Sequence, residues 1–98
     1  MSWDVKFTSK AEKQAKNVPP KVRESLFALV LEIRKLGPTR TTWHNYGKIR
    51  SKKDCYHCHL KKGKPTYIAI WKVTDKESKL VEVRYVGTHE NADYGRIC

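Results

Sequence analysis

After a short alternating segment at residues 2–8, the hydrophobic pattern of this chain changes its period at Gly37-Pro38. From residue 9 to that point the apolar residues recur at the i, i+3, i+4 spacing of amphipathic helices, and after it they alternate as in half-buried strands. A chain with helices in one half and a run of strands in the other is typical of an α+β fold, because each layer covers the apolar face of the other.

A strand and two helices are predicted for the first half. Residues 2–8 alternate between apolar and polar side chains, which indicates a half-buried strand. Ser9 followed by Glu12 has the spacing of a capping box and predicts the start of a short helix. The proline pair at 19–20 ends that helix and begins a second one, which stops at Gly37. The second helix carries an apolar stripe of Val22, Leu26, Leu29, Val30, Ile33 and Leu36.

Two further apolar residues, Phe27 and Leu31, lie beside this stripe and widen the apolar face of the second helix. Either this helix is deeply buried, or part of its surface is reserved for a partner. We favour burial, because large apolar side chains are most often found in the core.

Three strands with a short lead-in are predicted for the second half. They cover residues 45–50, 55–61, 65–73 and 80–87, and the connections at 62–65 and 75–78 have the composition of hairpin turns. Short loops imply antiparallel pairing of consecutive strands. We therefore expect one domain over residues 1–98, a two-layer α+β fold in which an N-terminal strand and two helices pack on an antiparallel sheet meander.

The chain is strongly basic, with 21 Lys and Arg against 10 Asp and Glu, a formal charge of +11 and a pI near 9.8. Such an excess favours a polyanionic partner, although charge kept only for solubility is the alternative. No apolar run approaches the roughly 18 residues that would span a bilayer. The first residues lack the features of a signal peptide, so we expect a cytoplasmic protein with no membrane partner.

Two histidines, His57 and His59, lie one residue apart in the string CYHCHL. On a strand, residues i and i+2 point to the same face about 6.6 Å apart, a separation at which two imidazoles can flank one phosphodiester. Basic residues precede and follow this string, and we expect them to hold an RNA backbone. They are Lys48, Arg50, Lys52, Lys53, Lys61, Lys62 and Lys64.

Cys55 and Cys58 flank the first histidine with a spacing that also occurs in zinc sites. On a strand these cysteines point to opposite faces, so the ligands cannot converge, and Cys58 is predicted to be a small buried hydrophobe. We therefore expect no metal and no other cofactor. The odd count of three cysteines fits a reducing compartment better than a disulfide framework.

Several strings resemble the RelE family of bacterial toxins, within the RelE/ParE superfamily of toxin-antitoxin systems. They are CYHCHL and VGTHE at residues 86–90, with Tyr94 beyond, and the resemblance in order and spacing extends over essentially the whole chain. It implies a RelE-like fold and an endoribonuclease that cuts messenger RNA, in many family members at the ribosomal A site. It also implies a cognate antitoxin protein that silences the toxin.

The resemblance assigns candidate catalytic residues. His57 and His59 occupy positions that are lysines in RelE, His89 occupies the position of an arginine, and Tyr94 matches a functional tyrosine. A further arginine of RelE, early in the strand after the glycine turn, has no counterpart in this chain at the aligned place, and Lys64 is the candidate to replace it. His44 receives no role.

RNA cleavage by its own 2′-hydroxyl needs a base, an acid and cations that stabilise the transition state. Histidines titrate near neutral pH, so His57, His59 and His89 are expected to form the acid and base set, with Tyr94 as a hydrogen-bond donor, proton carrier or stacking platform. We expect a metal-independent mRNA interferase that cleaves messenger RNA and has the ribosome as a partner. Two alternatives remain open: a ParE-like toxin that inhibits DNA gyrase without cleaving RNA, and an inactive RNA-binding regulator.

Overall fold

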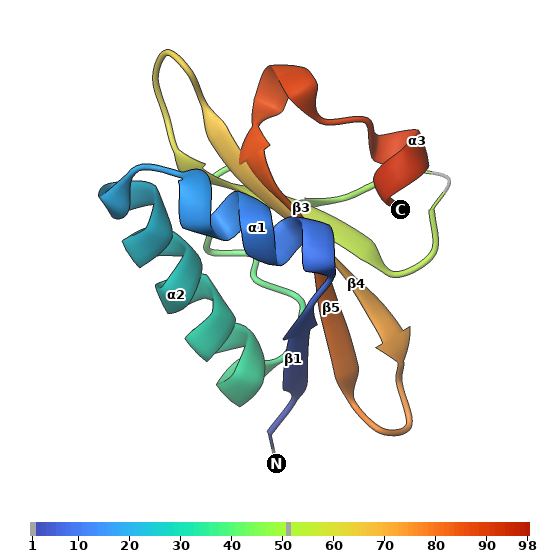
Figure 1. Ribbon diagram of the computed structural model, residues 1–98. Helices are drawn as coiled ribbons and strands as arrows, with labels where there is room; N and C mark the ends of the chain where they lie inside the picture. Colours follow the sequence, from blue (N-terminus) through green and yellow to red (C-terminus); the bar gives the residue numbers. More distant parts are fainter. Residues whose placement is uncertain (1, 51) are drawn as a thin grey trace.

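The computed structural model describes residues 2–50 and 52–98, which form one five-stranded sheet with two long helices against one face (Figure 1). The elements are β1 (Asp4–Phe7), α1 (Ser9–Asn17), α2 (Pro20–Leu36), β2 (Gly47–Lys48), β3 (Cys55–Lys61), β4 (Tyr67–Asp75), β5 (Leu80–Thr88), a 3-10 helix (His89–Asn91) and α3 (Tyr94–Ile97). The predicted two-layer α+β class and the antiparallel meander are confirmed. The strand order is β1-β5-β4-β3-β2, with β1 parallel to β5.

The start of α1 differs from the predicted capping box. The N-cap is Thr8, whose Oγ1 accepts a hydrogen bond from the Ala11 amide at 3.0 Å. Glu12 instead lies 3.7 Å from Lys16 on the surface of the helix. Serine and threonine are both good N-cap residues, and Thr8 takes the role because it is the residue that directly follows β1.

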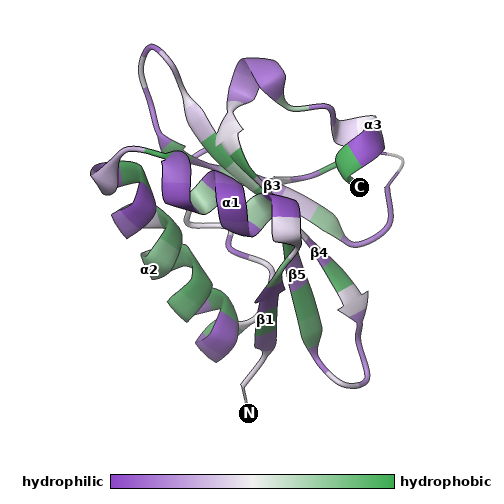
Figure 2. Ribbon diagram, in the orientation of Figure 1, coloured by the Kyte–Doolittle hydropathy of each residue, from purple (hydrophilic) through white to green (hydrophobic). Residues whose placement is uncertain are grey.

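The apolar face of α2 is only partly buried. Leu36 is 65% exposed, although it was predicted to be in the stripe, whereas the other stripe residues are buried. The expectation that Phe27 and Leu31 are buried is also wrong, because they are 57% and 54% exposed. The sheet covers one side of α2 only, and Figure 2 shows that apolar residues run along most of its length. The other side of α2 therefore presents an apolar surface.

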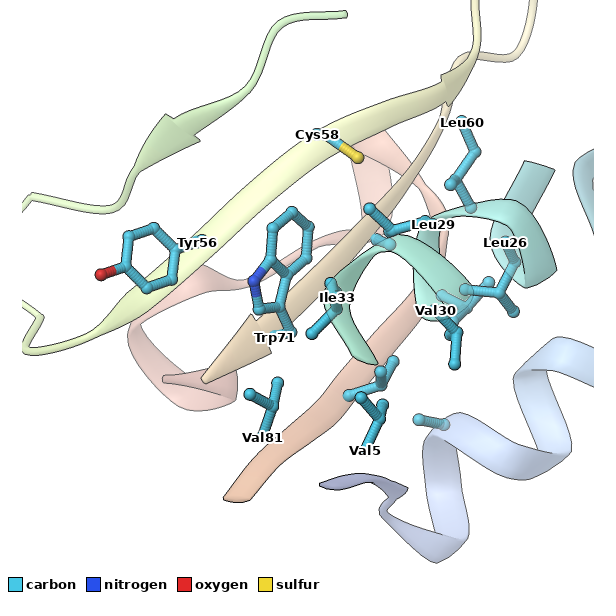
Figure 3. Close-up of a cluster of buried hydrophobic side chains, with 14 of the residues drawn as sticks. Val5, Leu26, Leu29, Val30, Ile33, Tyr56, Cys58, Leu60, Trp71 and Val81 are labelled. Carbon is cyan, nitrogen blue, oxygen red and sulfur yellow. The ribbon is translucent and has the colours of Figure 1, made fainter. Parts of the chain in front are cut away.

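The main core lies between the helices and the sheet (Figure 3). Trp71 of β4 is fully buried there, and its indole N–H donates a hydrogen bond of 2.9 Å to the carbonyl of Pro38. Tyr56, Cys58 and Leu60 of β3 point into the same core. The prediction for Cys58 is confirmed, and burial raises the pKa of its thiol to about 12.

A second, smaller core lies on the opposite face of the sheet, where the end of the chain packs over Ile49, Ile68, Ile70 and Tyr85. A disulfide joins Cys55 at the start of β3 to Cys98, and their Cα atoms are 6.1 Å apart. The expectation drawn from the odd cysteine count is therefore wrong for this pair. The two cysteines are 43 residues apart in sequence, so only the tertiary fold brings them together.

Candidate active site

The four residues assigned as catalytic come together on the second face of the sheet. His57 and His59 project from β3 on the side opposite Cys58, His89 begins the 3-10 helix after β5, and Tyr94 begins α3. The ring centroids of His57 and Tyr94 are 5.7 Å apart, and those of His59 and His89 are 5.9 Å apart. The chain thus forms two ring pairs next to each other, one on each histidine of β3.

The pairing of β4 explains why His89 reaches β3. Ile68 of β4 pairs with His59 on one side and with Gly87 of β5 on the other, so the end of β5 lies level with His59. The His89 amide then donates a hydrogen bond of 2.9 Å to the carbonyl of Thr66, which fixes the turn that leaves β5. Residues that are 30 positions apart in sequence are thereby held in one site by sheet hydrogen bonds.

The loop before β2 adds a residue that sequence reasoning missed. The His44 carbonyl accepts a hydrogen bond of 2.8 Å from the His59 amide, and the two rings are 5.7 Å apart. The amide nitrogen of Asn45 lies 3.3 Å from Nε2 of His59. One signal in the sequence could have found His44 and Asn45. They directly precede β2, which pairs with the histidine strand β3 and places Gly47 opposite His57.

Gly47 makes room for His57. A Cβ atom at this position would lie 3.2 Å from Nε2 of His57, a tight contact that would push the imidazole away by a few tenths of an ångström. Glycine is therefore the residue that lets β2 pair with β3 while the imidazole keeps its place.

The site favours the neutral form of both β3 histidines. Burial, followed by the nearby His89, lowers the pKa of His57 below its ordinary value. Burial also lowers the pKa of His59, with further contributions from His89 and His44. Nδ1 of each β3 ring is buried, and no described residue forms a hydrogen bond with it, so no carboxylate stabilises the charged form there.

Tyr94 has the opposite character. Burial raises the pKa of its phenol above the ordinary value of 10.0, so the hydroxyl keeps its proton at neutral pH. The site therefore places neutral imidazoles, which accept protons, next to a phenol that can donate one. This is the combination that acid and base catalysis requires.

The influence of His89 on its neighbours gives a direct test of this geometry. Replacing His89 with alanine should raise the pKa of both His57 and His59 toward 6.5, because it removes a group whose positive charge opposes theirs. NMR titration of the imidazole ring protons measures both values. An unchanged pKa at both rings would contradict the positions described for the three side chains.

The predicted RNA-binding residues are exposed, except that Lys52 is half-buried, and Lys53 lies beside Thr74 and Lys76 rather than beside the histidines. Lys62, in the turn after β3, is close enough to contribute to lowering the pKa of His59. Among the residues that the structure describes, none of the seven forms a salt bridge within the chain, so their charges are available to phosphates. They are Lys48, Arg50, Lys52, Lys53, Lys61, Lys62 and Lys64.

Residues 2–50 and 52–98 contain no group of three His, Cys, Asp or Glu side chains arranged to hold a metal ion. Cys55 is in a disulfide and Cys58 lies on the other face of β3, so the CYHCHL string does not form a ligand set. None of the helices in the same ranges is long and apolar enough to cross a bilayer.

No protein-family model matches the chain, and no curated protein is significantly similar to it in sequence. Solved structures do match. A free mutant of the E. coli toxin RelE has a TM-score of 0.73 and 25% identity, and the match covers 94% of this chain and 88% of RelE.

Two toxin-antitoxin complexes match as well. The toxin-antitoxin complex RelBE from E. coli matches with a TM-score of 0.70 and 24% identity, covering 92% of this chain and 100% of the matched one. The archaeal RelE-RelB complex of Pyrococcus horikoshii matches with a TM-score of 0.73 and 16% identity, covering 94% and 100%.

Proposed function

We propose that this chain, which has the RelE toxin fold, is the toxin of a toxin-antitoxin system and a metal-independent endoribonuclease that cleaves messenger RNA. The observation that carries the proposal is the meeting of His57, His59, His89 and Tyr94 on one face of the sheet. The basic residues that precede and follow the two histidines in the sequence fit a polyanionic substrate. The resemblance to RelE implies action on messenger RNA during translation. We therefore further propose that this chain works in the cytoplasm at the ribosome.

The proposed reaction begins with loss of the 2′-hydroxyl proton to a neutral imidazole of β3. The lowered pKa of His57 and of His59 makes these two rings the candidates for this base. The 2′-oxygen attacks phosphorus, and the bond from phosphorus to the 5′-oxygen breaks. His89 or Tyr94 gives a proton to that leaving oxygen, while nearby lysines stabilise the phosphorane-like transition state. The products are a 2′,3′-cyclic phosphate and a free 5′-hydroxyl.

The proposal is tested by incubating the purified protein with messenger RNA, with and without translating ribosomes, and mapping the transcript ends. We expect cleavage that persists in the presence of chelators and that requires the histidines. Absence of cleavage under both conditions would reject the proposal. An assay of gyrase supercoiling on the same sample would then test whether the chain is a ParE-like toxin instead.

RNA binding should be mainly electrostatic, with a log-log salt slope of about −0.7 for each phosphate neutralised. Replacing Lys61, Lys62 and Lys64 together with glutamine should flatten the slope by roughly two units. The matched control replaces three exposed lysines of the helical layer, Lys13, Lys21 and Lys35, with the same loss of charge. Equal changes in both proteins would show that RNA does not bind preferentially beside the histidines.

The two solved complexes pair RelE with RelB, and we propose a cognate antitoxin for this chain as well. An acidic segment would suit the charge of +11, since complementary charge speeds association and aids specificity. The exposed Phe27 and Leu31 of α2, next to Phe7, give such a partner an apolar contact surface. A purified complex with the antitoxin should therefore cleave RNA more slowly than the free toxin.

A further inference from the structure

The last ten residues, 89–98, cross the second face of the sheet as a strap. The strap starts at the hydrogen bond from the His89 amide to Thr66 and ends at the Cys98 disulfide. Between these points Ala92, Tyr94 and Ile97 pack against the smaller core. The strap is therefore attached at both ends and carries Tyr94 between them.

Additional hydrogen bonds hold the end of the strap. The Lys72 ammonium donates to the Cys98 carbonyl at 3.1 Å, and the Arg84 guanidinium donates to the Ile97 carbonyl at 3.3 Å. These donors lie on β4 and β5 and are partly exposed. Hydrogen bonds of this kind contribute only modestly, so the covalent bond is the strongest attachment of this end.

The disulfide lies close in sequence to both residues of the His57–Tyr94 ring pair. Cys55 precedes His57 by two residues on the same face of β3, and Cys98 follows Tyr94 by four residues in the chain. The Cys98 amide donates a hydrogen bond of 3.1 Å to the Tyr94 carbonyl, so the backbone of α3 transmits the position of Cys98 directly to Tyr94. A helix of four residues has little stability of its own and depends on such an anchor.

We propose that the Cys55–Cys98 disulfide positions Tyr94 against His57, so that the RNA-cleaving site is complete only in the oxidised protein. This inference rests on the proposed ribonuclease function. Cys55 and Cys98 are positioning residues in this account, since neither touches the substrate. Once this bond is broken, the hydrogen bonds that still hold this end of the strap are partly exposed, and Tyr94 would then leave His57.

The chemical step is reduction by a dithiol. Its thiolate attacks one sulfur of the Cys55–Cys98 bond, and the resulting mixed disulfide is resolved by the second thiol of the same reagent. Two electrons and two protons pass to the protein, which gains two thiols, while the dithiol becomes a disulfide. Cys58 does not compete, because it is fully buried on the other face of β3. Disulfides are rare in a reducing cytosol. The oxidised and active form would therefore accumulate under oxidising conditions.

The test uses the full chain with Cys58→Ala, which leaves one pair of cysteines. Hydrogen exchange followed by mass spectrometry compares residues 89–98 with α2 before and after treatment with dithiothreitol, and RNA cleavage is measured on the same samples. Reduction should speed exchange in the strap by roughly tenfold or more while α2 stays protected. It should slow cleavage by roughly 10-fold to 100-fold, since a displaced group of this kind costs about that much.

Two variants separate positioning from general loosening. In a Tyr94→Ala protein, reduction should leave the already slow cleavage rate unchanged, because the residue that the disulfide positions is absent. A Cys55→Ala, Cys98→Ala protein should match the reduced form and ignore dithiothreitol, which also checks the reagent.

The outcomes are distinguishable. A strap whose exchange is unchanged by reduction would overturn the inference, whether or not the protein cleaves RNA. A strap that loosens while cleavage stays fast would overturn the role of Tyr94. Loosening of the strap in a protein that cleaves no RNA in either state would support the anchor but reject the proposed function.

Discussion

Alanine at His57, His59 or His89 should slow RNA cleavage by roughly 10² to 10⁴-fold if that residue transfers a proton in the transition state. RNA affinity should change by only a few fold, because in the proposed function the lysines carry most of the binding. Single-turnover cleavage and RNA titration on the same variants measure both quantities. Asn17→Ala, on the exposed end of α1, is the control and should keep the full rate.

The pH dependence of the rate follows from the direction of the pKa shifts. In the proposed reaction a neutral imidazole acts as the base, and burial lowers the pKa of His57 and His59 below 6.5. The rate should therefore rise with pH through a midpoint below 6.5 and then level off. Removing the histidine that acts as the base should abolish this rise of the rate at acid pH, the acid limb of the profile. A rising limb centred well above 6.5 would contradict the assignment.

The alkaline limb identifies the proton donor. The pKa of Tyr94 is raised above 10.0, so a tyrosine donor would keep the rate level to strongly alkaline pH. With an imidazole as the donor, the rate would instead fall at a much lower pH, since histidine titrates near neutral pH. The profile of a Tyr94→Phe protein compared with that of His89→Ala shows which of the two residues sets this limb.

Local patterns were sufficient to predict the layers of the fold. The alternation over residues 55–61 placed His57 and His59 on one face and Cys58 on the other, which the structure confirms. Alternation has a period of two and leaves little freedom once one face is buried. The boundaries of the second helix were equally well marked by its two prolines and Gly37.

Long-range contacts were not predictable in the same way. The parallel pairing of β1 with β5 and the Cys55–Cys98 bond join segments that no short-range pattern relates. His44 was missed because it lies in a loop, whose position depends on the strand that follows. Phe27 and Leu31 were expected in the core because hydrophobicity does not say which side of a helix the sheet will cover.

Charge and proton transfer remain two distinct explanations for the site, because the resemblance places lysines where this chain has His57 and His59. A fixed cation stabilises the transition state at any pH below its own pKa, whereas a proton carrier must change its charge during the reaction. Lysine has an ordinary pKa near 10.4, far above that of histidine. Replacing both histidines with lysine therefore restores charge while removing groups that titrate near neutrality.

We expect the His57→Lys, His59→Lys protein to cleave RNA roughly 10² to 10⁴-fold more slowly and to lose the acid limb of its pH profile. Its RNA affinity should be equal or higher, because two positive charges are added next to Lys62. The matched His57→Gln, His59→Gln protein removes proton transfer without adding charge and should be equally slow. If the lysine protein kept the full rate and the same profile while the glutamine protein was inactive, the two residues would act as cations. Proton transfer would then belong to His89 and Tyr94, which lie next to them at 5.9 and 5.7 Å.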